Sequence, residues 1–114
     1  MKDLEGIWQP LYAELGGEEA PKMVLDKMEV ELAAGKYTVR FGGEASDHGT
    51  FMVDGAGLTL VGLKGPNAGR TILCIYKFIG DTLSICYGLG GKRPAKHHTG
   101  SDPELYLVNY TRKG

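Results

Sequence analysis

Short runs in which apolar and polar residues alternate recur along the chain. Lys27–Leu32 and Lys36–Phe41 both have an apolar residue at every second position, and Ala34-Gly35 between them is typical of a hairpin turn. A period of two with one polar face indicates antiparallel strands that are buried on one side. The second run is expected to turn three side chains inward: Tyr37, Val39 and Phe41.

Further segments fit a strand more loosely, and Gly, Asp, Asn or Pro turn signals bound each of them. They are Gly6–Leu15, Gly49–Val53, Leu58–Leu63, Thr71–Phe78, Thr82–Gly88 and Leu105–Arg112. One short helix is expected within Gly17–Asp26, after the first strand. Strands spaced by about ten residues fit a sandwich or an up-and-down barrel. We favour a barrel, because sequential hairpins close it without exposed edges. The prediction is one all-β domain over residues 1–114, an antiparallel up-and-down barrel of about eight strands.

The composition of the chain argues against several classes of function. The chain has 114 residues, of which 18 are glycines, and its net charge is -1. Glycine usage is well above the usual value of about 7%, which suits many tight turns. Because basic residues do not outnumber acidic ones, the net charge argues against nucleic acid as a partner. No apolar run approaches the length of a membrane span. Met1–Trp8 has no apolar signal core, so the default expectation is a cytoplasmic protein.

Two cysteines suggest a conditional cross-link. Cys74 and Cys86 each lie six positions from Gly80, so a hairpin centred there would place them opposite each other within bridging distance. A shift of one residue would turn them to opposite faces and forbid the bond. In a reducing compartment the alternative is two small buried apolar residues. The sequence leaves their redox state open.

Several local motifs were compared with catalytic or binding signatures. Gly65–Thr71 departs from the Walker pattern in spacing and in its basic residue, and a strand follows it, so it is interpreted as a turn. Ser46–Gly49 is interpreted as a polar turn between strands, and Lys92–His98 as a solvated loop. We expect no metal site and no cofactor. An enzyme is the least favoured hypothesis, because no spacing unites the residues it would need: His48, His97, His98, Asp81, Tyr76 and Cys86.

One set of residues carries a family resemblance over roughly residues 4–112. Gly6-Ile7-Trp8 resembles the Gly-x-Trp motif of calycins, the superfamily of lipocalins and fatty-acid-binding proteins. Further segments match, in order, a small lipocalin-like bacterial domain family of unknown function that is common in planctomycete proteomes. These are Gly35-Lys36-Tyr37, Gly49-Thr50-Phe51, Ile75-Tyr76, Gly80–Leu83, Ile85-Cys86-Tyr87 and Arg93-Pro94. The chain departs from the pattern at Cys74 and at Ala95–His98, so no role is carried over to those positions.

The resemblance implies a calycin-like barrel but no reaction, and members of the family can be exported. It implies that Trp8 plugs one end of the barrel, the alternative being a pocket wall, and that an arginine stacks on it. Arg112 is the first candidate for that arginine and Arg40 the second.

The favoured function is a binding module for a small apolar ligand. The cavity residues expected are Trp8, Tyr37, Val39, Phe41, Tyr76 and Tyr87. The alternative is a protein-interaction or regulatory module with a filled interior, including a homodimer formed through an unpaired edge strand.

Overall fold

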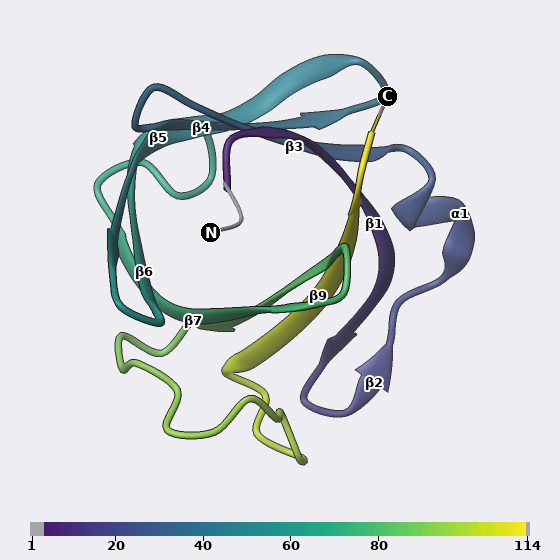
Figure 1. Ribbon diagram of the computed structural model, residues 1–114, viewed down its shortest axis with the longest axis vertical. Helices are drawn as coiled ribbons and strands as arrows, with labels where there is room; N and C mark the ends of the chain where they lie inside the picture. The colour runs from purple at the N-terminus through teal and green to yellow at the C-terminus, as the bar shows by residue number, and fades with distance from the viewer. Residues whose placement is uncertain (1–3, 114) are drawn as a thin grey trace.

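The computed structural model describes residues 4–113 and shows a ring of antiparallel strands, seen from above in Figure 1. Within these residues the sheet has nine strands in the order β2-β1-β3-β4-β5-β6-β7-β8-β9. Their bounds are β1 Gly6–Leu15, β2 Glu18–Glu19, β3 Met28–Ala33, β4 Lys36–Phe41, β5 Glu44–Asp54, β6 Gly57–Lys64, β7 Thr71–Ile79, β8 Thr82–Gly88 and β9 Leu105–Arg112. The predicted all-β up-and-down architecture is confirmed.

Pairing of the first strand with the last one closes the barrel. β1 lies antiparallel to β9 from Trp8↔Arg112 to Leu15↔Tyr106, while the start of β1 pairs with β3. Eight strands therefore form the ring, and the short β2 pairs only with the end of β1. The helix α1 (Lys22–Leu25) is shorter than expected and lies outside the ring beside β1 (Figure 1).

The two ends of the barrel differ in the length of their connections. Tight hairpins at Ala34-Gly35, Gly55-Ala56 and Gly80-Asp81 lie at the end where β1 begins, which we call the tryptophan end. The longer connections lie at the opposite end, which we call the loop end. The longest of them, between β8 and β9, runs outside the ring in Figure 1.

Trp8 plugs the tryptophan end. Its side chain is 1% exposed, and its indole N–H donates to the carbonyl of Leu4 at 2.8 Å. The guanidinium of Arg112 lies 4.3 Å from the ring centroid and donates to the carbonyl of Glu5. Gly6 has φ +141°, and a Cβ there would overlap the Arg112 guanidinium. The Gly-x-Trp spacing therefore reflects the passage of one arginine over both residues.

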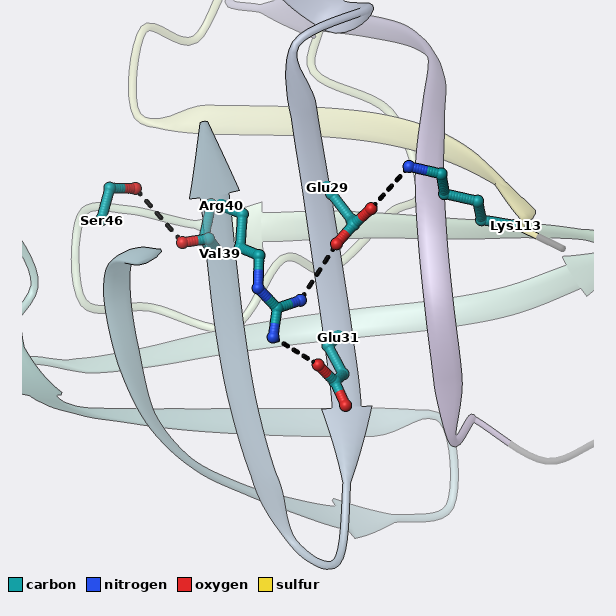
Figure 2. Close-up of polar contacts among 6 residues, drawn as sticks. All are labelled: Glu29, Glu31, Val39, Arg40, Ser46 and Lys113. Atoms are coloured by element: carbon teal, nitrogen blue, oxygen red, sulfur yellow. Dashed lines mark hydrogen bonds and ion pairs between the residues drawn. The ribbon is translucent and has the colours of Figure 1, made fainter. Parts of the chain in front are cut away.

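Arg40, the second candidate for that role, lies elsewhere. It projects from the outer face of β4 and bridges two glutamates of β3, at 3.0 Å from Glu29 and 2.6 Å from Glu31 (Figure 2). Lys113 donates to the other oxygen of Glu29 at 2.7 Å. These pairs lower the pKa of Glu29, with the Lys113 hydrogen bond as the larger cause. Arg40 therefore joins strands on the outside of the barrel and does not stack on Trp8.

The register of β7 and β8 corrects the cysteine prediction. The hairpin turns through two residues, Gly80-Asp81, so Cys74 lies opposite Tyr87 instead of Cys86. Because neighbouring positions alternate between faces, Cys74 belongs to the interior core and Cys86 points outward. Both thiols are free and buried. The one-residue shift rules out the conditional cross-strand disulfide, and the alternative of two buried thiols describes this pair.

Candidate functional site

The barrel interior contains a cavity of ≈ 440 Å³ toward its loop end. Residues at the start of β3 and β9, at the end of β1 and β8, and in the loop between β6 and β7 contribute to its wall. Most of the wall is apolar, and its aliphatic part includes Val30, Leu32, Leu58, Leu60, Ile72 and Ile85. The inward positions of the alternating runs therefore enclose a space instead of filling it completely.

The six expected cavity residues have three different locations. Tyr37, Val39 and Tyr87 line the cavity. Trp8 and Tyr76 belong instead to the packed tryptophan end, where both rings lie near Phe78.

Phe41 was expected to line the cavity, and it does not. It is the last residue of β4, beside the Gly42-Gly43 turn, and it is 46% exposed. Its cross-strand partner Met28 lines the cavity, so Phe41 continues the inner face of β4 but stands at the rim, where the wall no longer covers it.

Asp47 is the site residue that the sequence interpretation missed. The segment expected to be a polar turn is the first half of β5, and Asp47 faces inward from it with 6% of its surface exposed. Its Oδ2 accepts a hydrogen bond from the Asn67 amide at 2.8 Å and a longer one from the Tyr37 hydroxyl at 3.4 Å. Its Oδ1 is buried and has no hydrogen-bond partner among the described residues.

Glycines bring the β6–β7 loop onto Asp47. Gly65 has φ +96°, and a Cβ there would collide with the carbonyl of Ser46 and lie 3.0 Å from Asp47 Oδ1. A Cβ on Gly62 would collide with the carbonyl of Asn67. The loop can therefore lie against the barrel and present Asn67 to the carboxylate only because these positions lack side chains. The turn predicted here is confirmed, and it forms part of the cavity wall.

Asp47 places a negative charge beside the cavity. Burial, followed by the negative charge of Asp47 and the hydrogen bond to it, raises the pKa of Tyr37 to about 12. The Tyr37 hydroxyl is thus a proton donor throughout the physiological range. Of the described residues that line the cavity, Asp47 alone carries a formal charge.

Three tyrosines form the opposite part of the wall. The hydroxyls of Tyr87 and Tyr110 are 2.6 Å apart, so one donates to the other and the second keeps a proton to donate. The rings of Tyr87 and Tyr106 lie 5.4 Å apart. Burial raises the pKa of all three phenols, which are therefore neutral hydrogen-bonding groups in an apolar wall.

The residues that an enzyme would need do not converge on this cavity. His97 lies outside the barrel, where its Nε2 is 2.6 Å from the hydroxyl of Ser84, which also bonds Asn109 at 2.6 Å. This network attaches the β8–β9 connection to the outer face of the sheet. Asp81 lies in a hairpin turn at the other end of the molecule.

The basic cluster within this connection has a structural contact of its own. Arg93 donates to the carbonyls of Cys74 and Leu58 and, at 2.9 Å, to the hydroxyl of Thr59. The connection expected to be a solvated loop is therefore tied to β6 and β7 through this side chain.

The described residues contain neither a metal-binding cluster nor a membrane-spanning helix. Residues 4–113 contain no cluster of His, Cys, Asp and Glu that could hold a metal ion. No helix in that range is long and apolar enough to cross a bilayer. The sequence and structure match none of the family models, curated proteins or solved structures with which they were compared. The lipocalin-like resemblance therefore rests on the sequence motifs alone.

Proposed function

We propose that the protein is a binding module that holds a small, largely apolar molecule inside the barrel. The observation that carries the proposal is the cavity of ≈ 440 Å³ with a mostly apolar wall. Its volume lies within the range of about 300–1,000 Å³ that is usual for small-molecule sites. A few polar groups among apolar walls, as at Asp47 and the tyrosine pair, are also usual for such sites.

The distribution of packing supports this assignment over a filled interaction module. The tryptophan end is tightly packed around Trp8 and Phe78, whereas the loop end contains the cavity. The edge that a partner strand would use is also absent at the closure, since β1 and β9 pair along most of their length. Ligand binding is thus the function that the interior favours.

The proposal is tested by thermal unfolding in the presence of a library of small hydrophobic molecules. A ligand at about a hundred times its Kd stabilises the folded state by about 2.7 kcal/mol. For a domain of this size that corresponds to a rise in Tm of roughly 10 °C. Trp8 fluorescence is a poor reporter here, because the ring is buried at the opposite end from the cavity.

A pair of variants separates cavity binding from surface binding. Val39→Phe places added bulk in the cavity wall, whereas Val53→Phe makes the same change at an exposed position on β5. We expect the first variant to lose the ligand-induced rise in Tm and the second to retain it. A flat response of the unaltered protein to the whole library would refute the proposed function.

A further inference from the structure

We infer that the cavity selects a molecule with an apolar body and a protonated amine, and rejects the corresponding carboxylate. This inference rests on the proposed function and names the chemical class of its ligand. It is carried by the buried carboxylate of Asp47 in a wall that has no described cationic side chain.

Asp47 retains unused capacity to accept hydrogen bonds. An ionised carboxylate has about four acceptor sites, and the described contacts use only Oδ2, through Asn67 and Tyr37. The other oxygen is buried without a partner among the described residues. A buried acceptor left in this state is costly. A rotation of the carboxylate that turns this oxygen from Gly65 toward the cavity lets a ligand donor remove that cost.

The formal charge that the described residues bring to the cavity wall is negative and comes from Asp47. A buried carboxylate without a counter-ion is unfavourable, and pairing it with a cation restores much of the lost solvation. Neither Asn67 nor Tyr37 brings a positive charge to Asp47. An ammonium group supplies both the charge and the donors, whereas a ligand carboxylate would place two like charges in one apolar space.

The aromatic part of the wall favours the same ligand. Tyr37, Tyr87, Tyr106 and Tyr110 all line the cavity, so aromatic rings surround the space that the carboxylate shares. The face of a tyrosine ring attracts a cation, with more effect when water is excluded. The tyrosine rings and the Asp47 carboxylate would together stabilise the positive charge of an alkylammonium or an arylalkylammonium ion.

The test compares three ligands that share one chain and differ in head group: decylamine, decanol and decanoate. Binding to the full chain is measured by calorimetry at neutral pH, where the amine is protonated and the acid is ionised. A hydrogen bond to a charged group is stronger than a neutral one, so we expect decylamine to bind about ten- to a hundredfold more tightly than decanol. Decanoate should bind more weakly than decanol.

Matched variants assign the preference to one side chain. Asp47→Asn removes the charge with little change in shape, and Asp54→Asn makes the same change at the exposed end of the same strand. Asp47→Asn should abolish most of the difference between decylamine and decanol, whereas Asp54→Asn should leave it intact. If Asp47→Asn does not fold, the order of the three ligands on the unaltered protein decides the question alone.

The outcomes distinguish the two proposals. Equal affinity for all three ligands, or tighter binding of decanoate, overturns the amine preference and leaves the cavity as a general apolar site. A difference between amine and alcohol that persists in Asp47→Asn also overturns it. Absence of binding by all three, together with a flat library response, refutes the proposed function and this inference with it.

Discussion

Replacing Gly6 by alanine should weaken the closure of the barrel at the tryptophan end. The new Cβ would occupy the position of the Arg112 guanidinium, and φ +141° is unfavourable for any residue with a side chain. The backbone strain costs about 1–3 kcal/mol. Displacing the arginine removes a cation–π contact of about 0.5–1 kcal/mol and a charged hydrogen bond of about 1.5–3 kcal/mol. Partial relaxation leaves a net loss of roughly 3–5 kcal/mol.

Thermal and urea unfolding measure this loss directly. At roughly 4 °C per kcal/mol, Gly6→Ala should lower the Tm by about 12–20 °C. Gly35→Ala is the matched control, because Gly35 also has a positive φ, +77°, but has no other group within 4 Å. The control should lose only the strain of about 1 kcal/mol.

A double variant tests whether the arginine is the cause. If Gly6→Ala acts by displacing Arg112, then adding Arg112→Ala should cost less than the two single changes together. Strict additivity, or a loss no greater than that of Gly35→Ala, would refute the explanation given for the Gly-x-Trp motif.

Three further predictions concern other parts of the molecule. Tyr110→Phe should cost about 1–2 kcal/mol in urea unfolding because it leaves the Tyr87 hydroxyl without its partner, and the double Phe variant should cost less than the sum of the single ones. Cys74 and Cys86 should resist thiol reagents until the protein unfolds, since burial raises both pKa values, that of Cys74 to about 12; a loss of two hydrogens on air oxidation, seen by mass spectrometry, would contradict the register. Burial lowers the pKa of His97, so as the pH falls the unfolded chain takes up a proton on His97 before the folded protein does. The stability that neutral His97 contributes should therefore decline below about pH 6.5. A His97→Gln variant should show a flatter dependence of stability on pH, and an unchanged dependence would contradict the assignment.

Alternation between apolar and polar residues, together with the turn signals between the runs, was sufficient to predict the barrel and most of its strands. The bounds predicted for the first and last strands, Gly6–Leu15 and Leu105–Arg112, are those of β1 and β9. Each face of these strands has one environment, so a period of two carries the information that the fold needs. The pairing of the Trp8 and Arg112 side chains was reached through the family resemblance and not through the pattern.

Two local features could not be predicted from the alternation of apolar and polar residues. The Gly80-Asp81 turn has two residues instead of one at its centre, and this difference reverses the face of Cys86 relative to Cys74. Asp47 was not predicted as an inward residue because polar residues in sequence are typical of a turn. A bulge also shifts the register of β5 against β4 between Val39 and Arg40, so simple alternation does not give the face of Asp47. The preceding Gly42-Gly43 pair was the available signal, since a turn placed there makes the following residues a strand.

The pairing of β1 with β9 also has a consequence for biosynthesis. Contacts between the earliest and the latest strands have the largest sequence separation in the domain, and such contacts form slowly. While β9 is still inside the ribosome, β1 has one unpaired edge and Trp8 lacks the cover of Arg112. The nascent chain therefore exposes the edge of β1 and the Trp8 side chain until β9 has left the ribosome.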